Sequence, residues 1–149
     1  GIIPPFAEIQ TGKRLVLGSM SFSESAVIEF ARRYDPQDFH LDHEAAINGP
    51  FGALAASGWH TAACWMRCFI DTVQRSGSAV QPGPSPGFSN LRWLKPVYAG
   101  DTITYDTRAV EKRLTSRPGW GLVKAKNSGI NQHGAAVFEF ESVNFWKAT

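Results

Sequence analysis

Several classes of protein are excluded by what this sequence has little of. Its charge is almost balanced, with 15 basic and 13 acidic residues and a net charge of +2, which is too even for a dedicated nucleic-acid-binding protein. It holds two cysteines, Cys64 and Cys68, which cannot build a disulfide framework. It shows no signal-peptide pattern and no apolar run long enough to cross a membrane, so we expect a cytoplasmic protein.

What is present has the composition of an ordinary folded domain. The chain has 149 residues, of which 43% are hydrophobic and 19% charged, so neither disorder nor an internal repeat is indicated. This length suits one hydrophobic core. We therefore expect a single domain over residues 1–149.

The first third of the sequence predicts short elements. Residues 2–10 contain Pro4 and Pro5 and are expected to be extended, and residues 13–20 are apolar enough for a strand. Ser21 and Glu24 have the spacing of a helix capping box, so a helix is expected to begin there. Pro36 ends this helix and places Asp35 at its exit. A further helical turn is expected over residues 42–48.

Residues 57–75 predict a long and largely buried helix. Its apolar residues recur at helical spacing, which is typical of a helix packed against a core. The predicted buried stripe comprises Trp59, Ala62, Ala63, Met66, Ile70 and Val73, widened by Cys64, Trp65 and Phe69. The two cysteines are therefore interpreted as core residues, and Trp59 and Trp65 likewise.

From Phe88 to the end the apolar residues follow a period of two, which is typical of strands. Leu91, Trp93 and Val97 predict one strand, and three more follow as far as Trp146, separated by turns rich in Gly, Pro and Asp. The expected fold is α+β, with a long central helix wrapped by a curved antiparallel sheet of about five strands, which is the hot-dog arrangement. Because the sheet edge and one helix flank would stay exposed, a homodimer is expected.

The residues with the clearest chemical meaning lie between Tyr34 and His60. Asp35 and His40 are five residues apart with Pro36 between them, and Ser57 and Gly58 begin the long helix. A carboxylate and an imidazole are a suitable acid–base pair for handling a proton and a water molecule. A helix start offers unpaired N–H groups to a developing negative charge.

The motif Asp35-x-x-x-x-His40-x-Asp42, with Phe51, Ser57-Gly58 and the later Pro96-Val-Tyr-Ala-Gly-Asp101, resembles the MaoC-type (hydratase 2) enoyl-CoA hydratases and acyl dehydratases. The resemblance runs from about Phe6 to Trp146. It implies a homodimeric hydro-lyase that acts on an acyl thioester, without a metal or redox cofactor, and gives an (R)-3-hydroxyacyl product. It also implies that Asp35 and His40 activate water and that the Gly58 N–H binds the thioester oxygen.

The motif departs from the common family pattern Gly-Asp-x-Asn-Pro-Leu-His around its acid. Tyr34, Gln37, Asp38 and Phe39 stand in place of the usual residues, which bears on the substrate more than on the chemistry. The substrate-binding residues we expect are Tyr34, Phe39, Phe51, Ser57, Arg92 and Lys95. Arg92, Lys95 or the pair Lys124 and Lys126 are candidates, from their charge alone, for holding the phosphates of CoA.

Plainer interpretations of the same residues stay open at this point. An Asp before Pro is a common helix-exit residue, His40 fits a half-buried histidine, and Ser57 fits a helix cap. A metal site built from His40, Asp42, His43 and His60 lacks the usual ligand spacing, and His60 and His133 are interpreted as structural or solvated.

Two other functions fit the same fold. A hot-dog thioesterase places its acid on the long helix, where Asp71 is the one acid and lies far from the helix start. A non-catalytic module that binds acyl thioesters would keep its function without Asp35 and His40. Loss of hydration in variants of both residues separates the hydratase from this module.

Overall fold

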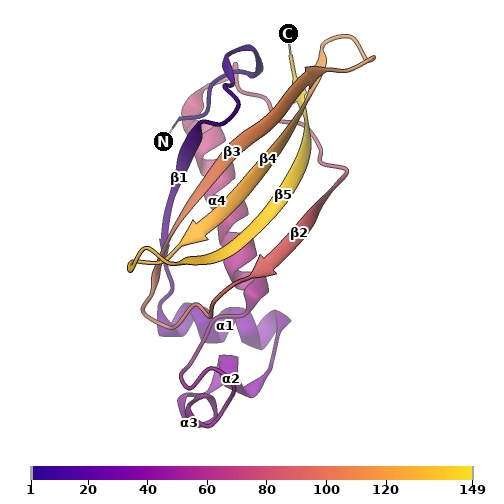
Figure 1. Ribbon diagram of the computed structural model, residues 1–149. Helices are drawn as coiled ribbons and strands as arrows, with labels where there is room; N and C mark the ends of the chain where they lie inside the picture. Colours follow the sequence, from indigo (N-terminus) through magenta and orange to yellow (C-terminus); the bar gives the residue numbers. More distant parts are fainter. Residues whose placement is uncertain (1, 149) are drawn as a thin grey trace.

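The computed structural model describes residues 2–148 and contains five antiparallel strands and one long helix (Figure 1). The strands are β1 (Arg14–Ser21), β2 (Gly87–Trp93), β3 (Thr102–Leu114), β4 (Trp120–Ile130) and β5 (Ala136–Lys147), in the order β1-β3-β4-β5-β2. The helices are η1 (Phe6–Glu8), α1 (Glu24–Tyr34), α2 (Asp38–Leu41), α3 (His43–Ile47) and α4 (Gly58–Ser76). The predicted α+β architecture is confirmed.

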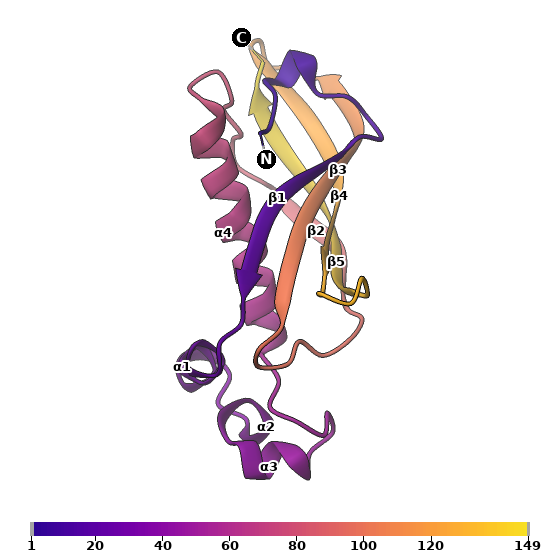
Figure 2. The ribbon, with the colours of Figure 1, turned by 90° about the vertical axis from the view of Figure 1, so that its left-hand side faces the viewer.

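The long helix α4 lies along one face of the sheet, and the three helices α1 to α3 gather at the end of the molecule where α4 begins (Figure 2). In the part of the chain that the structure describes, the opposite face of the sheet carries no helix (Figure 2). We call this uncovered side the outer face. The arrangement brings the exit of α1, the short helix α2 and the start of α4 to one end of the fold.

Hydrogen bonds to backbone carbonyl groups join α4 to the sheet. The indole Nε1–H of Trp65 donates to the Asp106 carbonyl at 3.0 Å, and the Tyr105 hydroxyl donates to the Thr61 carbonyl at 2.7 Å. Both side chains are buried, so each bond satisfies a polar group that would otherwise cost free energy in the core. These two bonds therefore fix the position of α4 on the sheet.

The predicted buried stripe of α4 is wrong in its main members. Trp59, Met66 and Ile70 are exposed, whereas the buried face comprises Thr61, Cys64, Trp65, Cys68, Phe69 and Thr72. A helix that is apolar nearly all round has two faces that fit a core equally well, and periodicity alone does not choose between them. Trp59 is thus not a core residue, while the interpretation of Trp65, Cys64 and Cys68 as core residues is confirmed.

Two expectations for the N-terminal segment are also corrected. Residues 6–8 form the short 3₁₀ helix η1 despite the two prolines, because Pro5 precedes its first turn with a φ of −58° and helix starts tolerate proline there. The cap of α1 is Ser23, whose Oγ accepts from the Ala26 N–H at 3.2 Å. Ser21 stays in β1, opposite Thr102.

The strand expected around Leu91 ends earlier than the alternation suggests. β2 stops at Trp93, and Val97 lies beyond it in a buried segment whose carbonyl accepts from the Ala56 N–H at 2.7 Å. Pro96 cannot donate to a strand ladder, which accounts for the early end. This segment after β2 therefore contacts Ala56, which lies two residues before the start of α4.

Candidate active site

Asp35 stands at the C-terminal end of α1, as the sequence predicts. Its N–H still donates to the Ala31 carbonyl, but its own backbone has left the helical region, with φ −152° and ψ 66°. Pro36 forces this exit because it disfavours a helical residue before it. The Asp35 side chain is 18% exposed at this helix exit.

His40 lies on α2, a four-residue helix that the sequence analysis did not identify. The His40 side chain is 5% exposed, and its Nδ1 lies 2.6 Å from the Ala55 carbonyl oxygen. A carbonyl can only accept, so Nδ1 carries the hydrogen and donates it. The other ring nitrogen, Nε2, then faces the Asp35 Oδ2 at 3.3 Å. One backbone contact thus fixes the ring orientation and directs Nε2 at the Asp35 carboxylate.

The Asp35 carboxylate is surrounded by groups that favour its charged form. Partial burial raises the pKa of Asp35, but the hydrogen bond from Gln37, the Ser57 hydroxyl and the nearby His40 together lower that pKa below its usual value. The Gln37 amide donates to Oδ1 at 2.6 Å, which leaves Oδ2 directed at His40. Asp35 is therefore ionised at neutral pH.

Ser57 and Gly58 bring the start of α4 to this pair. Ser57 is fully buried, and its Oγ has no hydrogen-bond partner of normal geometry among residues 2–148, although it lies near enough to lower the pKa of Asp35. The Gly58 N–H belongs to the first turn of α4, where the helix has no carbonyl for it. No other acceptor for this N–H is found in the described chain.

Trp93, at the end of β2, packs against Gly58. The indole Nε1–H donates to the Gly58 carbonyl at 2.8 Å, and a Cβ built on Gly58 would lie 2.4 Å from the indole ring. The Trp59 ring lies edge-on to Trp93 with 5.1 Å between the centroids. A side chain at position 58 would clash with the Trp93 ring, so this close packing requires Gly58. The sequence held no local signal for this contact, because the two residues are far apart in the chain.

Aromatic side chains flank the Asp35–His40 pair. Phe39 lies edge-on to His40 at 4.5 Å between ring centroids and to Phe51 at 5.4 Å. Tyr34 is 70% exposed and rests on Phe30 at 5.1 Å. Phe39 and Phe51 are thus brought to the predicted site, whereas the contact found for Tyr34 is with Phe30.

The predicted basic residues divide between two regions. Arg92 precedes Trp93 but lines a hollow on the outer face, together with Lys126. Lys124 pairs with Glu111 at 3.2 Å on the neighbouring strand. Lys95 is exposed just after β2. The structure therefore does not bring Arg92 and Lys126 together with Asp35 and His40.

His60, two residues after Gly58, is enclosed by rings. Its imidazole stacks on Phe30 with centroids 4.6 Å apart and lies 4.8 Å from Phe22. Burial lowers the pKa of His60 to about 4, so this side chain is neutral at pH 7. Its Nδ1 is buried and has no partner among residues 2–148. His60 thus joins α1 to α4 and is a packing residue.

No three His, Cys, Asp or Glu side chains among residues 2–148 gather closely enough to hold a metal ion. In the same residues, no helix is both long and apolar enough to cross a membrane. The site comprises a carboxylate, an imidazole of defined orientation, a buried hydroxyl and a free backbone N–H.

The family described as "MaoC like domain" matches residues 8–129 of this chain. Among curated proteins, the chain is 28% identical over 134 residues to the uncharacterized protein YdeM of Bacillus subtilis, a match that covers 90% of this chain and 92% of the relative.

Solved structures are also similar to this chain. The crystal structure of the MaoC-like dehydratase from Rhodospirillum rubrum is similar with a TM-score of 0.84 and 30% identity, over 97% of each chain. The unliganded R-hydratase PhaJ1 from Pseudomonas aeruginosa gives a TM-score of 0.75 at 22% identity, over 97% of this chain and 86% of the other, which is a likeness of fold.

Proposed function

Because the chain belongs to the MaoC-like domain family, we propose that it is a hydro-lyase that adds water across the C2–C3 double bond of an enoyl thioester, or removes it. The single observation that carries this proposal is the Asp35–His40 pair, 3.3 Å apart, beside the start of α4. Hot-dog proteins host several chemistries, so the argument depends on the site and not on the fold alone.

The reaction needs a proton taken from water, an oxygen added at C3 and a proton delivered to C2. The ionised Asp35 carboxylate is the group best suited to draw the proton from water, because its neighbours keep its pKa low. His40 Nε2 faces the same space and is oriented by the Ala55 carbonyl. Together the two side chains would hold one water molecule and exchange the two protons.

Negative charge develops on the thioester oxygen during this addition. The free N–H of Gly58 at the positive end of α4 is suited to bind that oxygen. One such donor is typically worth roughly 3 kcal/mol of barrier. Ser57, with a buried and unpartnered Oγ beside Asp35, would hydrogen-bond the water or the carboxylate when substrate fills the site.

The acyl group would lie against the aromatic residues Tyr34, Phe39 and Phe51, and Lys95 remains a candidate for a CoA phosphate. No cofactor is proposed. A second copy of the chain would complete the site, because exposed apolar residues lie along α4 and along the edge strand β2 as far as Gly58. These residues are Trp59, Met66, Ile70, Phe88 and Trp93. The homodimer is thus proposed as the form that binds substrate.

The test is loss of the conjugated enoyl-thioester absorbance with a panel of trans-2-enoyl-CoA substrates. We expect hydration by the native protein and a loss of at least a hundredfold in kcat/KM for Asp35→Asn and for His40→Ala. Asp38→Asn and His43→Gln are matched controls, because both residues are exposed on α2 and α3 and lie outside the pair.

Other outcomes would contradict the proposal. Release of free CoA without hydration would indicate a thioesterase. Tight acyl-CoA binding, with no turnover of any substrate and no effect of either variant, would indicate a binding module. Equal loss of activity in the control variants would show that the effects come from folding and not from the Asp35–His40 pair.

A further inference from the structure

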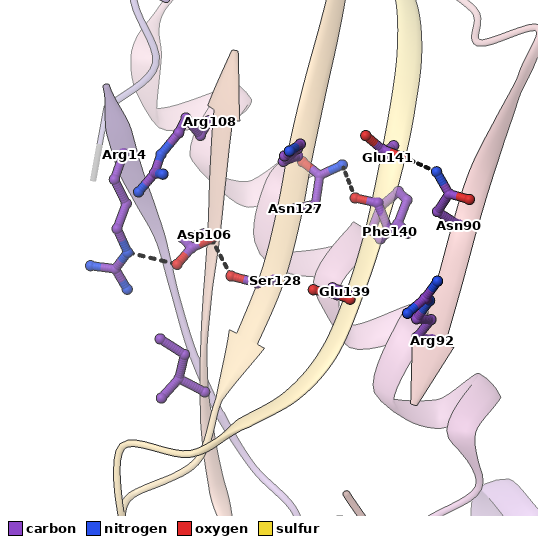
Figure 3. A pocket seen from close by; sticks show the side chains of 12 residues that line it. Arg14, Asn90, Arg92, Asp106, Arg108, Asn127, Ser128, Glu139, Phe140 and Glu141 are labelled. Carbon is purple, nitrogen blue, oxygen red and sulfur yellow. Dashed lines mark hydrogen bonds and ion pairs between the residues drawn. The ribbon is translucent and has the colours of Figure 1, made fainter. Parts of the chain in front are cut away.

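A hollow of about 580 Å³ lies on the outer face of the sheet, away from α4 (Figure 3). All five strands contribute to its lining, and its volume is in the range of small-molecule sites. Neither Asp35 nor His40 lines it. Its side chains are mostly charged, which distinguishes it from the aromatic surroundings of the proposed active site.

Three basic residues stand in one row across this hollow. Arg14 on β1 is the register partner of Arg108 on β3, and Arg108 is in turn the partner of Lys126 on β4. Directly opposed residues of an antiparallel pair share a face, and like charges in such positions destabilise the pairing. We call these three residues the cationic row. The fold thus places three like charges side by side on one face of the sheet.

Of the carboxylates nearby, Asp106 pairs with one member of this row, Arg14. Asp106, whose side chain is 8% exposed, accepts from Arg14 Nε at 2.6 Å and from the Ser128 hydroxyl at 2.6 Å. Asp106 therefore fixes the Arg14 side chain at Nε and leaves its terminal nitrogens available. Figure 3 shows this bond and places Arg108 beside Arg14.

Glu141 is the register partner of Lys126, but the hydrogen bond drawn for it in Figure 3 comes from Asn90. Within residues 2–148, neither Arg108 nor Lys126 has a carboxylate oxygen within 4.0 Å. Two of the three cations in the row are thus without an ion pair, in a hollow where one arginine is already held in place.

We propose that the cationic row binds the terminal phosphate or diphosphate of a small phosphate ester. Guanidinium groups match phosphate oxygens in a fork of two hydrogen bonds, and lysine adds a point charge. A bound phosphate would also remove the repulsion along the row. Glu139 and Glu141 line the β5 side of the same hollow and would repel a long polyanion, which favours a small ligand over nucleic acid.

Inorganic pyrophosphate is the probe, titrated calorimetrically into the full chain at constant ionic strength. We expect binding by the native protein and at least a tenfold weaker Kd for Arg108→Gln and for Lys126→Gln. Lys124→Gln is the matched control, since Lys124 lies on the same strand, is already paired with Glu111 at 3.2 Å and does not line the hollow.

Stability without ligand provides a second measurement. Because each variant removes one of the opposed charges, Arg108→Gln and Lys126→Gln should unfold at the same or a higher urea concentration than the native protein in the absence of phosphate. Added pyrophosphate should stabilise the native protein and Lys124→Gln but not the other two. Absence of pyrophosphate binding by the native protein, or equal Kd values for all three variants, would overturn the proposal.

The phosphate has two possible sources, the CoA part of the proposed substrate and a separate phosphorylated ligand. If CoA phosphates bind the row during turnover, Arg108→Gln raises the KM for an enoyl-CoA but not for the matching enoyl-pantetheine. An unchanged KM with lost pyrophosphate binding identifies a separate ligand. The pyrophosphate titration needs no turnover, so it tests this site independently of the proposed hydro-lyase activity.

Discussion

At the scale of single residues, the Asp35 carboxylate is controlled by groups within a few ångströms. Gln37 binds Oδ1, His40 faces Oδ2, and the nearby Ser57 hydroxyl also lowers the pKa of Asp35. The sequence identified Asp35 and His40 as candidates, but it treated Gln37 as a departure from the family pattern. An amide two residues after an acid is a local signal that would have identified Gln37 as a partner of Asp35.

The pH dependence of activity should follow from this environment. The pKa of Asp35 is below its usual value, so the reactive carboxylate is present at neutral pH and is lost as the pH falls through that lowered pKa. We expect Gln37→Met, which keeps the side-chain length but cannot donate, to raise the pKa of Asp35. The acidic limb of the kcat/KM profile should then move to higher pH.

Gln74→Met serves as the control for that profile, because Gln74 is exposed on α4 and far in sequence from the site. An acidic limb at the same pH in Gln37→Met and the native protein would show that the amide hydrogen bond does not control the ionisation of Asp35. Loss of activity at every pH without a shift of the limb would indicate a role in folding instead.

At the scale of secondary-structure elements, one hydroxyl ties α4 to the irregular part of β1. The register of β1 shifts between Val16 and Gly18, which takes Leu17 out of the regular pairing with β3. The buried Thr72 hydroxyl lies 2.7 Å from the Leu17 carbonyl and 2.8 Å from the Cys68 carbonyl. The Thr72 hydroxyl is the nearer of two donors to the Leu17 carbonyl that the bulge sets free, and the other is Arg75 Nη2 at 3.5 Å.

We expect Thr72→Val to lower the free energy of unfolding by about 1–3 kcal/mol, because the buried Leu17 carbonyl then keeps only the longer bond from Arg75 Nη2 at 3.5 Å. Thr72→Ser retains the hydroxyl and loses one methyl group, so it should cost less. Urea denaturation of both variants measures the difference. Equal stabilities for Thr72→Val and the native protein would rule out this tie between helix and strand.

At the scale of the whole molecule, the exposed apolar side of α4 is the feature that the single chain leaves unexplained. Met66 and Ile70 are 51% and 38% exposed and lie on the same side of the helix. Monomeric proteins rarely expose contiguous apolar surface of this kind without a function. A second copy of the chain is the occupant proposed above.

The double variant Met66→Glu, Ile70→Glu should therefore convert dimers to monomers at micromolar concentration, as measured by analytical ultracentrifugation. Charges placed in an apolar interface lose hydration without gaining partners. Val110→Glu is the control, because Val110 is 46% exposed on β3 and outside α4. A dimer that survives the double change would mean that α4 is not the interface.

The sequence by itself determined the main elements and the chemical candidates, but not the short helices η1 and α2. Helix α4, the period-two strands and the exit at Pro36 depend on residues that are neighbours along the chain, so local spacing predicts them. The motif that includes Asp35, His40 and Gly58 is equally local, and its resemblance to the family agrees with the match over residues 8–129.

The tertiary structure alone decided which face of α4 is buried, that Trp93 packs on Gly58, and that Arg14, Arg108 and Lys126 form one row. The row joins strands that are distant in sequence, and a shift of register by one residue would turn each side chain to the other face. Such contacts depend on strand order and bulges, which arise from packing of the whole chain and leave no pattern within any short segment.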